Sequence, residues 1–206
     1  MLPFRTYPFR IDYTNPKDGD TAQYLSNGIG IRLTGPADPN SVSSAIKINP
    51  YFPGELSGFP GFISIYSRDH DLTPNTIYHV TISTALRSKD GKNLQSPYTF
   101  SFVTPPFKVL NTDPSNGEQY VQRLQYISVS FDGRIDTASA RLAFSMEPRV
   151  PGHFLTRYYG TTNFTYSPDS IYAAATTYRV IVSTALRSID GVHIARPDTI
   201  SFTTMP

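Results

Sequence analysis

The sequence contains no cysteine and no tryptophan among its 206 residues. The absence of cysteine excludes disulfide bonds, thiolate nucleophiles and zinc sites built from thiolates. Folding does not require such cross-links here, because a domain of about 100 residues buries roughly 60–70% of the surface that its unfolded chain exposes. We therefore expect packing and backbone hydrogen bonds alone to hold the fold.

Charge and long apolar runs are also scarce. The 18 basic and 16 acidic residues give a formal net charge of +2, and the basic residues are scattered along the chain, which does not favour a nucleic-acid partner. No apolar run approaches the roughly 18 residues of a membrane-spanning helix, so direct membrane insertion is not expected. The first residues lack the basic start, apolar core and cleavage site of a signal peptide, and any export signal is expected outside this sequence.

What the chain does contain is a stretch that occurs twice. Residues 80–91 read VTISTALRSKDG and residues 180–191 read VIVSTALRSIDG, which differ at only three positions. A period of about 100 residues indicates a duplicated domain rather than a solenoid repeat. We predict one domain at residues 7–104 and a second at residues 105–206, with residues 1–6 as the end of a preceding module or a leader.

Each copy has the pattern of short strands separated by turns. Apolar residues alternate at 29–33 and 127–131, which places one face of each strand in a core and the other in water. The copies differ most at residues 51–71 and 150–170, and each of these regions is expected to form a strand, a turn and a second strand. Further strands and turns follow the same order in both copies: strands near 45–49, 62–67, 142–147 and 163–167, and turns at 38–41 and 136–139. With no helical period of useful length, the pattern predicts two β-sandwiches in tandem.

Both copies carry the motifs Pro-x-Asx-Gly, Asp-x-x-Ser, Tyr-x-Val, Leu-Arg-Ser-x-Asp-Gly and a closing Ser-Phe-x-Thr, in the same order. This order resembles the bacterial Ig-like domain of S-layer proteins and other large exported proteins, and the resemblance covers essentially the whole chain. It implies an all-β chain of two tandem Ig-like β-sandwiches, located outside the cell, on its surface or in the periplasm. Family members serve mainly as spacers, and some occur within alpha-2-macroglobulin-like protease traps. The family implies no catalytic residues and no cofactor.

Candidate sites for chemistry are better explained as turns. Asn116-Gly117-Glu118-Gln119 contains the Gly-Glu-Gln of a macroglobulin thioester, but Asn116 stands where the thioester needs cysteine. Asp18-Gly19-Asp20 and Asp69-His70-Asp71 offer oxygen ligands for calcium without the spacing of a calcium-binding loop. The four histidines are not at ligand spacing, and there is no Gly-x-Ser-x-Gly elbow. We expect no enzymatic activity, no cofactor and no metal.

Aromatic residues in the divergent regions raise a second hypothesis. Tyr51, Phe59, Tyr158 and Tyr159 are candidates for an interaction surface, because exposed aromatic rings stack on sugars and anchor protein interfaces. The alternative is that they fill the sandwich cores. Two functions follow: a non-catalytic spacer of a larger exported surface or macroglobulin-like protein, whose partners are its neighbouring domains, or a glycan- or protein-binding module that uses residues 51–71 and 150–170. Exposure of Tyr158 and Tyr159 on one face would favour the second.

Overall fold

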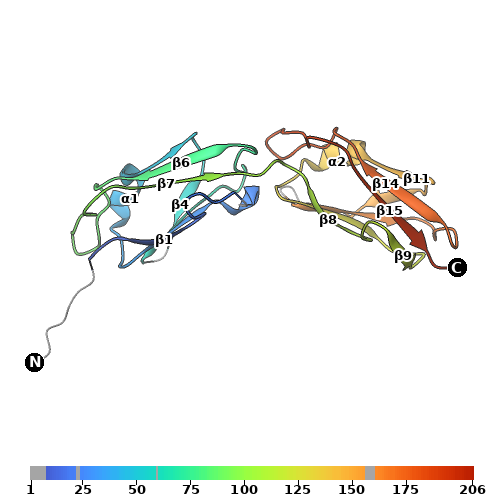
Figure 1. Cartoon of the computed structure of the whole chain (residues 1–206), viewed down its shortest axis with the longest axis horizontal. Helices are drawn as coiled ribbons and strands as arrows, with labels where there is room; N and C mark the ends of the chain where they lie inside the picture. The colour runs from blue at the N-terminus through green and yellow to red at the C-terminus, as the bar shows by residue number, and fades with distance from the viewer. Residues whose placement is uncertain (1–7, 22–23, 59, 156–160) are drawn as a thin grey trace, which may run out of the picture. The chain divides into compact units, whose positions relative to one another are not determined.

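The structure is a computed structural model that describes residues 8–21, 24–58, 60–155 and 161–206. The chain divides into two compact units, Met1–Pro105 and Pro106–Pro206. Two β-sheets face one another in each unit, as Figure 1 shows. The prediction of an all-β chain made of two tandem sandwiches is confirmed.

Unit 1 pairs its strands in the orders β1-β2-β5-β4 and β3-β6-β7. Neighbouring strands within both sheets are antiparallel. The elements are β1 (Ile11–Asn15), the 3-10 turn η1 (Leu25–Asn27), β2 (Ile29–Leu33), α1 (Pro39–Ala45), β3 (Ile46–Asn49), β4 (Glu55–Ser57), β5 (Phe62–Tyr66), β6 (Ile77–Ile82) and β7 (Tyr98–Val103).

Unit 2 repeats this plan with the orders β12-β13-β10-β8 and β11-β14-β15-β9. Its elements are β8 (Val109–Asp113), β9 (Glu118–Val121), β10 (Ile127–Phe131), α2 (Thr137–Ala143), β11 (Phe144–Glu147), β12 (Gly152–Phe154), β13 (Asn163–Pro168), β14 (Thr177–Val182) and β15 (Asp198–Thr204). The strands predicted near 62–67 and 163–167 are thus present as β5 and β13.

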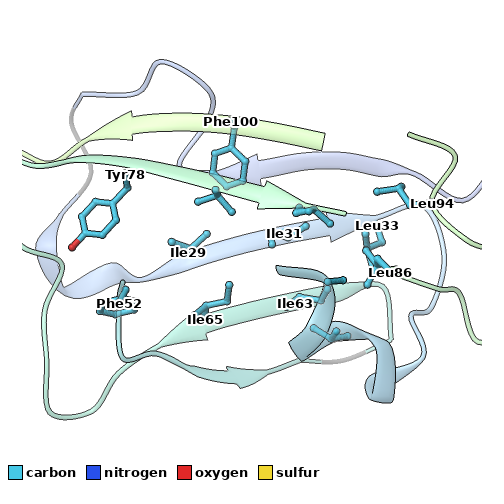
Figure 2. Close-up of a cluster of buried hydrophobic side chains, with 14 of the residues drawn as sticks. Ile29, Ile31, Leu33, Phe52, Ile63, Ile65, Tyr78, Leu86, Leu94 and Phe100 are labelled. Atoms are coloured by element: carbon cyan, nitrogen blue, oxygen red, sulfur yellow. The ribbon is translucent and has the colours of Figure 1, made fainter. Parts of the chain in front are cut away.

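The core of unit 1 follows directly from the alternation of its strands. Ile29, Ile31 and Leu33 of β2 are at most 3% exposed, and their side chains point between the sheets. Figure 2 shows Tyr78 of β6 and Phe100 of β7 opposite this layer. Each fully buried aliphatic or aromatic side chain contributes about 1.5–3 kcal/mol, so the strand pattern accounts for the cohesion of the unit.

One predicted turn in each copy is a short helix instead. Asp38 begins α1 by accepting a hydrogen bond from the amide of Asn40 (3.1 Å), and Asp136 begins α2 in the same way with Ala138 (3.0 Å). Pro39 stands at the first helical position, where its missing N–H costs nothing. Both helices are only seven residues long, too short to give a recognisable helical period.

The repeated Leu-Arg-Ser block connects these helices to the segment that follows β6 or β14. In unit 2 the amide of Arg187 donates to Ser139 Oγ (3.0 Å), and Ser139 Oγ donates to the carbonyl of Asp136 (2.7 Å). The Arg187 guanidinium also pairs with Asp136 (2.8 Å), although both side chains are substantially exposed. Unit 1 makes the same contacts through its own Asp, Ser and Arg. The block that identified the duplication is therefore structural.

Tyrosine corners close each sandwich. The hydroxyls of Tyr78 and Tyr178 accept hydrogen bonds from the amides five residues upstream, at 2.9 and 2.8 Å. The last core position of each unit is a buried threonine, Thr104 or Thr204, whose hydroxyl donates to a carbonyl of the same loop at 2.6 Å in both units. Each unit thus completes its own hydrogen bonds at its end.

Tyr172 is an exception, because its polar group is buried without a hydrogen bond. It occupies the place of Leu72, is fully buried, and its hydroxyl has no hydrogen-bond partner among the described residues. Burial raises the pKa of Tyr172, and the neighbouring Tyr166 and Tyr178 raise it further. The hydroxyl is therefore a buried neutral group that lowers stability.

Two tyrosine substitutions in unit 2 are expected to have opposite effects. Tyr178→Phe removes the acceptor of the Ala173 amide and should lower the free energy of unfolding by about 1 kcal/mol. Tyr172→Phe removes an unsatisfied hydroxyl and should leave it unchanged or raise it by up to about 1 kcal/mol. Urea denaturation of the full chain measures both, and a larger loss for Tyr172→Phe than for Tyr178→Phe would contradict this account.

The helix-connecting block gives a second contrast. Ser139→Ala removes a buried hydroxyl that both donates and accepts, and should destabilise unit 2 by about 1–3 kcal/mol. Arg187→Ala removes a largely exposed ion pair and should cost about 0.2–1 kcal/mol. Thermal or urea unfolding of the two variants tests the order, which would be wrong if the arginine variant were the less stable.

Candidate functional site

The Asx-Gly turns have a structural role in both units. Asp18 Oδ1 accepts a hydrogen bond from the amide of Ser101 (2.8 Å), and Asn116 Oδ1 accepts one from the amide of Ser201 (2.9 Å). Gly19 and Gly117 follow with φ of +78° and +83°, which favours glycine. The Asn116-Gly-Glu-Gln sequence is thus a turn that fastens an early segment to the last strand.

The histidine contacts are also local. His193 Nδ1 lies 2.6 Å from the carbonyl oxygen of Thr184, the place where Asn93 donates to Thr84 in unit 1. His153 Nδ1 lies 2.8 Å from Asp169 Oδ1 at an exposed position. In the described ranges, no group of three or more His, Cys, Asp and Glu side chains is placed to hold a metal ion.

The proposed aromatic surface is described only in part. Tyr51 is 81% exposed in the connection between β3 and β4. Phe59, Tyr158 and Tyr159 lie outside the described residues, so the surface built on them stays a prediction. The divergent regions contain the antiparallel hairpins β4–β5 and β12–β13, which place β4 and β12 at sheet edges.

Each unit has a groove beside this edge hairpin. In unit 1 a depression of about 570 Å³ has a mainly apolar lining that includes Val42 of α1, Leu56 of β4 and Phe62 of β5. In unit 2 a depression of about 450 Å³ lies between β11 and β12 and is lined by charged and aromatic side chains. The groove-lining residues used below are Arg141, Phe144, Arg149, Phe154, Tyr166 and Asp169.

Tyr166 connects the charged and aromatic parts of the unit 2 groove. Its hydroxyl donates a hydrogen bond to the carbonyl of Val150 (2.8 Å). Burial raises the pKa of Tyr166, and the nearby Asp169 carboxylate adds to the rise while the Arg149 guanidinium opposes it. Charges of both signs therefore act on the inner wall of this groove.

Sequence reasoning found only half of this groove. Phe154, Tyr166 and Asp169 fall inside the divergent region 150–170, whereas Arg141, Phe144 and Arg149 precede it. The missing signal was a comparison of the copies position by position. Such a comparison pairs Ser43 with Arg141 and Ile46 with Phe144, and so places a new charge and a new ring in the second copy only.

No helix in the described part of the chain has the length and apolar character needed to cross a membrane.

A search of curated proteins gives no match. The likeness to alpha-2-macroglobulin-like proteins thus stays a prediction.

Solved structures resemble the chain at low identity. The N-terminal part of the bacterial S-layer protein SbsC is 12% identical with a TM-score of 0.39, covering 95% of this chain and 44% of that one. An L,D-transpeptidase from Mycobacterium smegmatis is 11% identical with a TM-score of 0.40, covering 97% and 100%. The L,D-transpeptidase LdtMt1 bound to imipenem is 17% identical with a TM-score of 0.36, covering 49% and 41%. This chain therefore spans less than half of two of these three structures.

The family comparison is decisive where these likenesses are not. The family described as "Bacterial Ig-like domain" matches the sequence twice, at residues 5–104 and 103–204. The two matches together cover nearly the whole chain and coincide with the two sandwiches. The protein belongs to the bacterial Ig-like domain family and carries two copies of that domain in tandem.

Proposed function

We propose that the chain is a non-catalytic structural segment of an exported bacterial surface protein, where it spaces other domains and withstands tension along the chain. Membership of the bacterial Ig-like family supports an exported or surface location. The described histidine and carboxylate contacts are accounted for by turns and exposed pairs. The neighbouring domains of the parent protein are its partners in this role.

The observation that carries the proposal is how an early segment of each unit pairs with the last strand of that unit. In unit 2, β9 runs parallel to β15, with hydrogen bonds from the Gly117 amide to Ser201 (2.7 Å) and from the Met205 amide to Val121 (3.0 Å). In unit 1, Asp20 bridges Phe102 in parallel, with corresponding bonds of 2.7 Å on both sides. The side chains of Asp18 and Asn116 add one more bond in each unit.

Parallel pairing of an early segment with the last strand sets the direction of loading. When a chain is pulled from its two ends, the early segment moves backward and the last strand moves forward along the same axis. Both segments are then displaced along the direction of the strands, so the hydrogen bonds between them are loaded together in shear rather than broken one by one. This geometry is suited to a spacer that must stay folded under force.

Single-molecule pulling of the full chain tests this role. We expect two unfolding events, each releasing a chain length of roughly 35 nm for about 100 residues at ~3.5 Å per residue. Asn116→Ala removes the side-chain bond to Ser201 and should speed the forced unfolding of unit 2 about fivefold, leaving unit 1 unchanged.

The matched control is Asn111→Ala, an exposed asparagine of β8 in the same unit, which should not change either event. The proposal fails if Asn116→Ala unfolds no faster than this control, or if both units extend without measurable resistance.

A further inference from the structure

The groove of unit 2 lies at the open side of the sandwich, between the edges of its two sheets. β11 is the edge strand of one sheet and β12 the edge strand of the other, so each has a strand neighbour on one side only. The depression between them has a volume of about 450 Å³, within the range of about 300–1,000 Å³ that holds small ligands.

Three aromatic rings line this groove. The ring centroids of Phe144, Phe154 and Tyr166 lie 4.6–5.5 Å apart, and both phenylalanines are only half-buried. The same strand registers place Ile46, Leu56 and Ile65 at these three positions in unit 1. The sandwich therefore forms without aromatic residues there, and the rings are an addition of the second copy.

Two guanidiniums stand at the rim. Arg141 comes from α2 and Arg149 from the connection between β11 and β12, and both are exposed. Neither makes an ion pair or hydrogen bond with another described residue. The corresponding residues of unit 1 are Ser43 and Tyr51, which carry no charge, so these two charges are also not required by the fold.

Asp169 supplies a single carboxylate in the same groove, already in contact with His153. Two positive charges against one negative charge favour an anionic ligand, and a guanidinium binds a carboxylate through two parallel hydrogen bonds. The Asp169 carboxylate would repel a ligand that offers only negative groups. It favours one that also carries hydroxyl donors.

We propose that the groove between β11 and β12 binds an acidic oligosaccharide that contains uronic acid residues. The carboxylate of the sugar pairs with Arg141 and Arg149, a hydroxyl donates to Asp169, and the apolar face of the pyranose ring packs on Phe154. The proposal is independent of the tension-bearing role, because it concerns a different surface of unit 2.

Titration of the full chain with trigalacturonate, followed by calorimetry and by amide chemical shifts, tests the site. We expect saturable binding, shifts concentrated at residues 141–155 and 163–169, and a Kd that rises with ionic strength. Galactotriose, which has no carboxylate, should bind at least tenfold more weakly. Hexaglutamate, which has carboxylates and no sugar ring, should also bind at least tenfold more weakly.

Truncating exposed arginines and copying one residue from unit 1 keep the test clear of folding defects. Arg149→Ala and Arg141→Ala should each weaken binding about tenfold or more, since bonds between charged groups are the stronger class. Phe154→Leu introduces the residue of unit 1 and should weaken binding several-fold, with the urea midpoint measured in parallel. Arg196→Ala, an exposed arginine of the β14–β15 connection outside the groove, is the control and should bind normally.

The inference is overturned if trigalacturonate shows no saturation below about 10 mM. It is overturned equally if galactotriose or hexaglutamate binds as tightly, or if the two groove arginine variants bind like Arg196→Ala. In none of these cases would the pulling behaviour of the chain be affected.

Discussion

Burial of one face of each sheet against the other is the constraint on which the rest of this structure depends. With no disulfide available, the inward side chains of β2, β5, β6 and β7 in unit 1 and their counterparts in unit 2 must supply the cohesion. Their burial fixes the strand registers, because a shift by one residue would turn each apolar face to the solvent. The capped helices, tyrosine corners and paired Asx turns then fasten the connections between strands whose places are already set.

The internal duplication separates what this fold needs from what it tolerates. Both copies keep the helix-capping aspartate, the buried serine of the helix, the corner tyrosine and the closing threonine, each with the same hydrogen bonds. The copies differ at the sheet edge, where aliphatic residues and Tyr51 in unit 1 are replaced by aromatic residues and Arg149 at the corresponding positions of unit 2. Residues that the fold does not require are available for binding a ligand. The groove of unit 2 is built from such residues, which makes it a candidate binding site.

Most of the fold could be predicted from the sequence because period-two alternation and turn residues are local signals. The strands at 29–33 and 127–131 lie where alternation places them. The helices α1 and α2 were not predicted, because seven residues are too few to show a helical period. Asp38-Pro39 is nevertheless a signal for the start of a helix. The parallel pairing of β9 with β15 and the union of Arg141 with Asp169 in one groove are long-range results of chain topology, which no local pattern contains.

The buried threonines at the ends of the two units have a consequence for how such proteins evolve. Thr104 and Thr204 donate to carbonyls of their own units and accept from amides of the same units, so these hydrogen bonds are made within each copy. A genetic boundary placed after such a threonine transfers a self-sufficient folding unit. Duplication, deletion or exchange at that boundary changes the reach of an array and the set of surfaces it displays while every remaining sandwich keeps its own core.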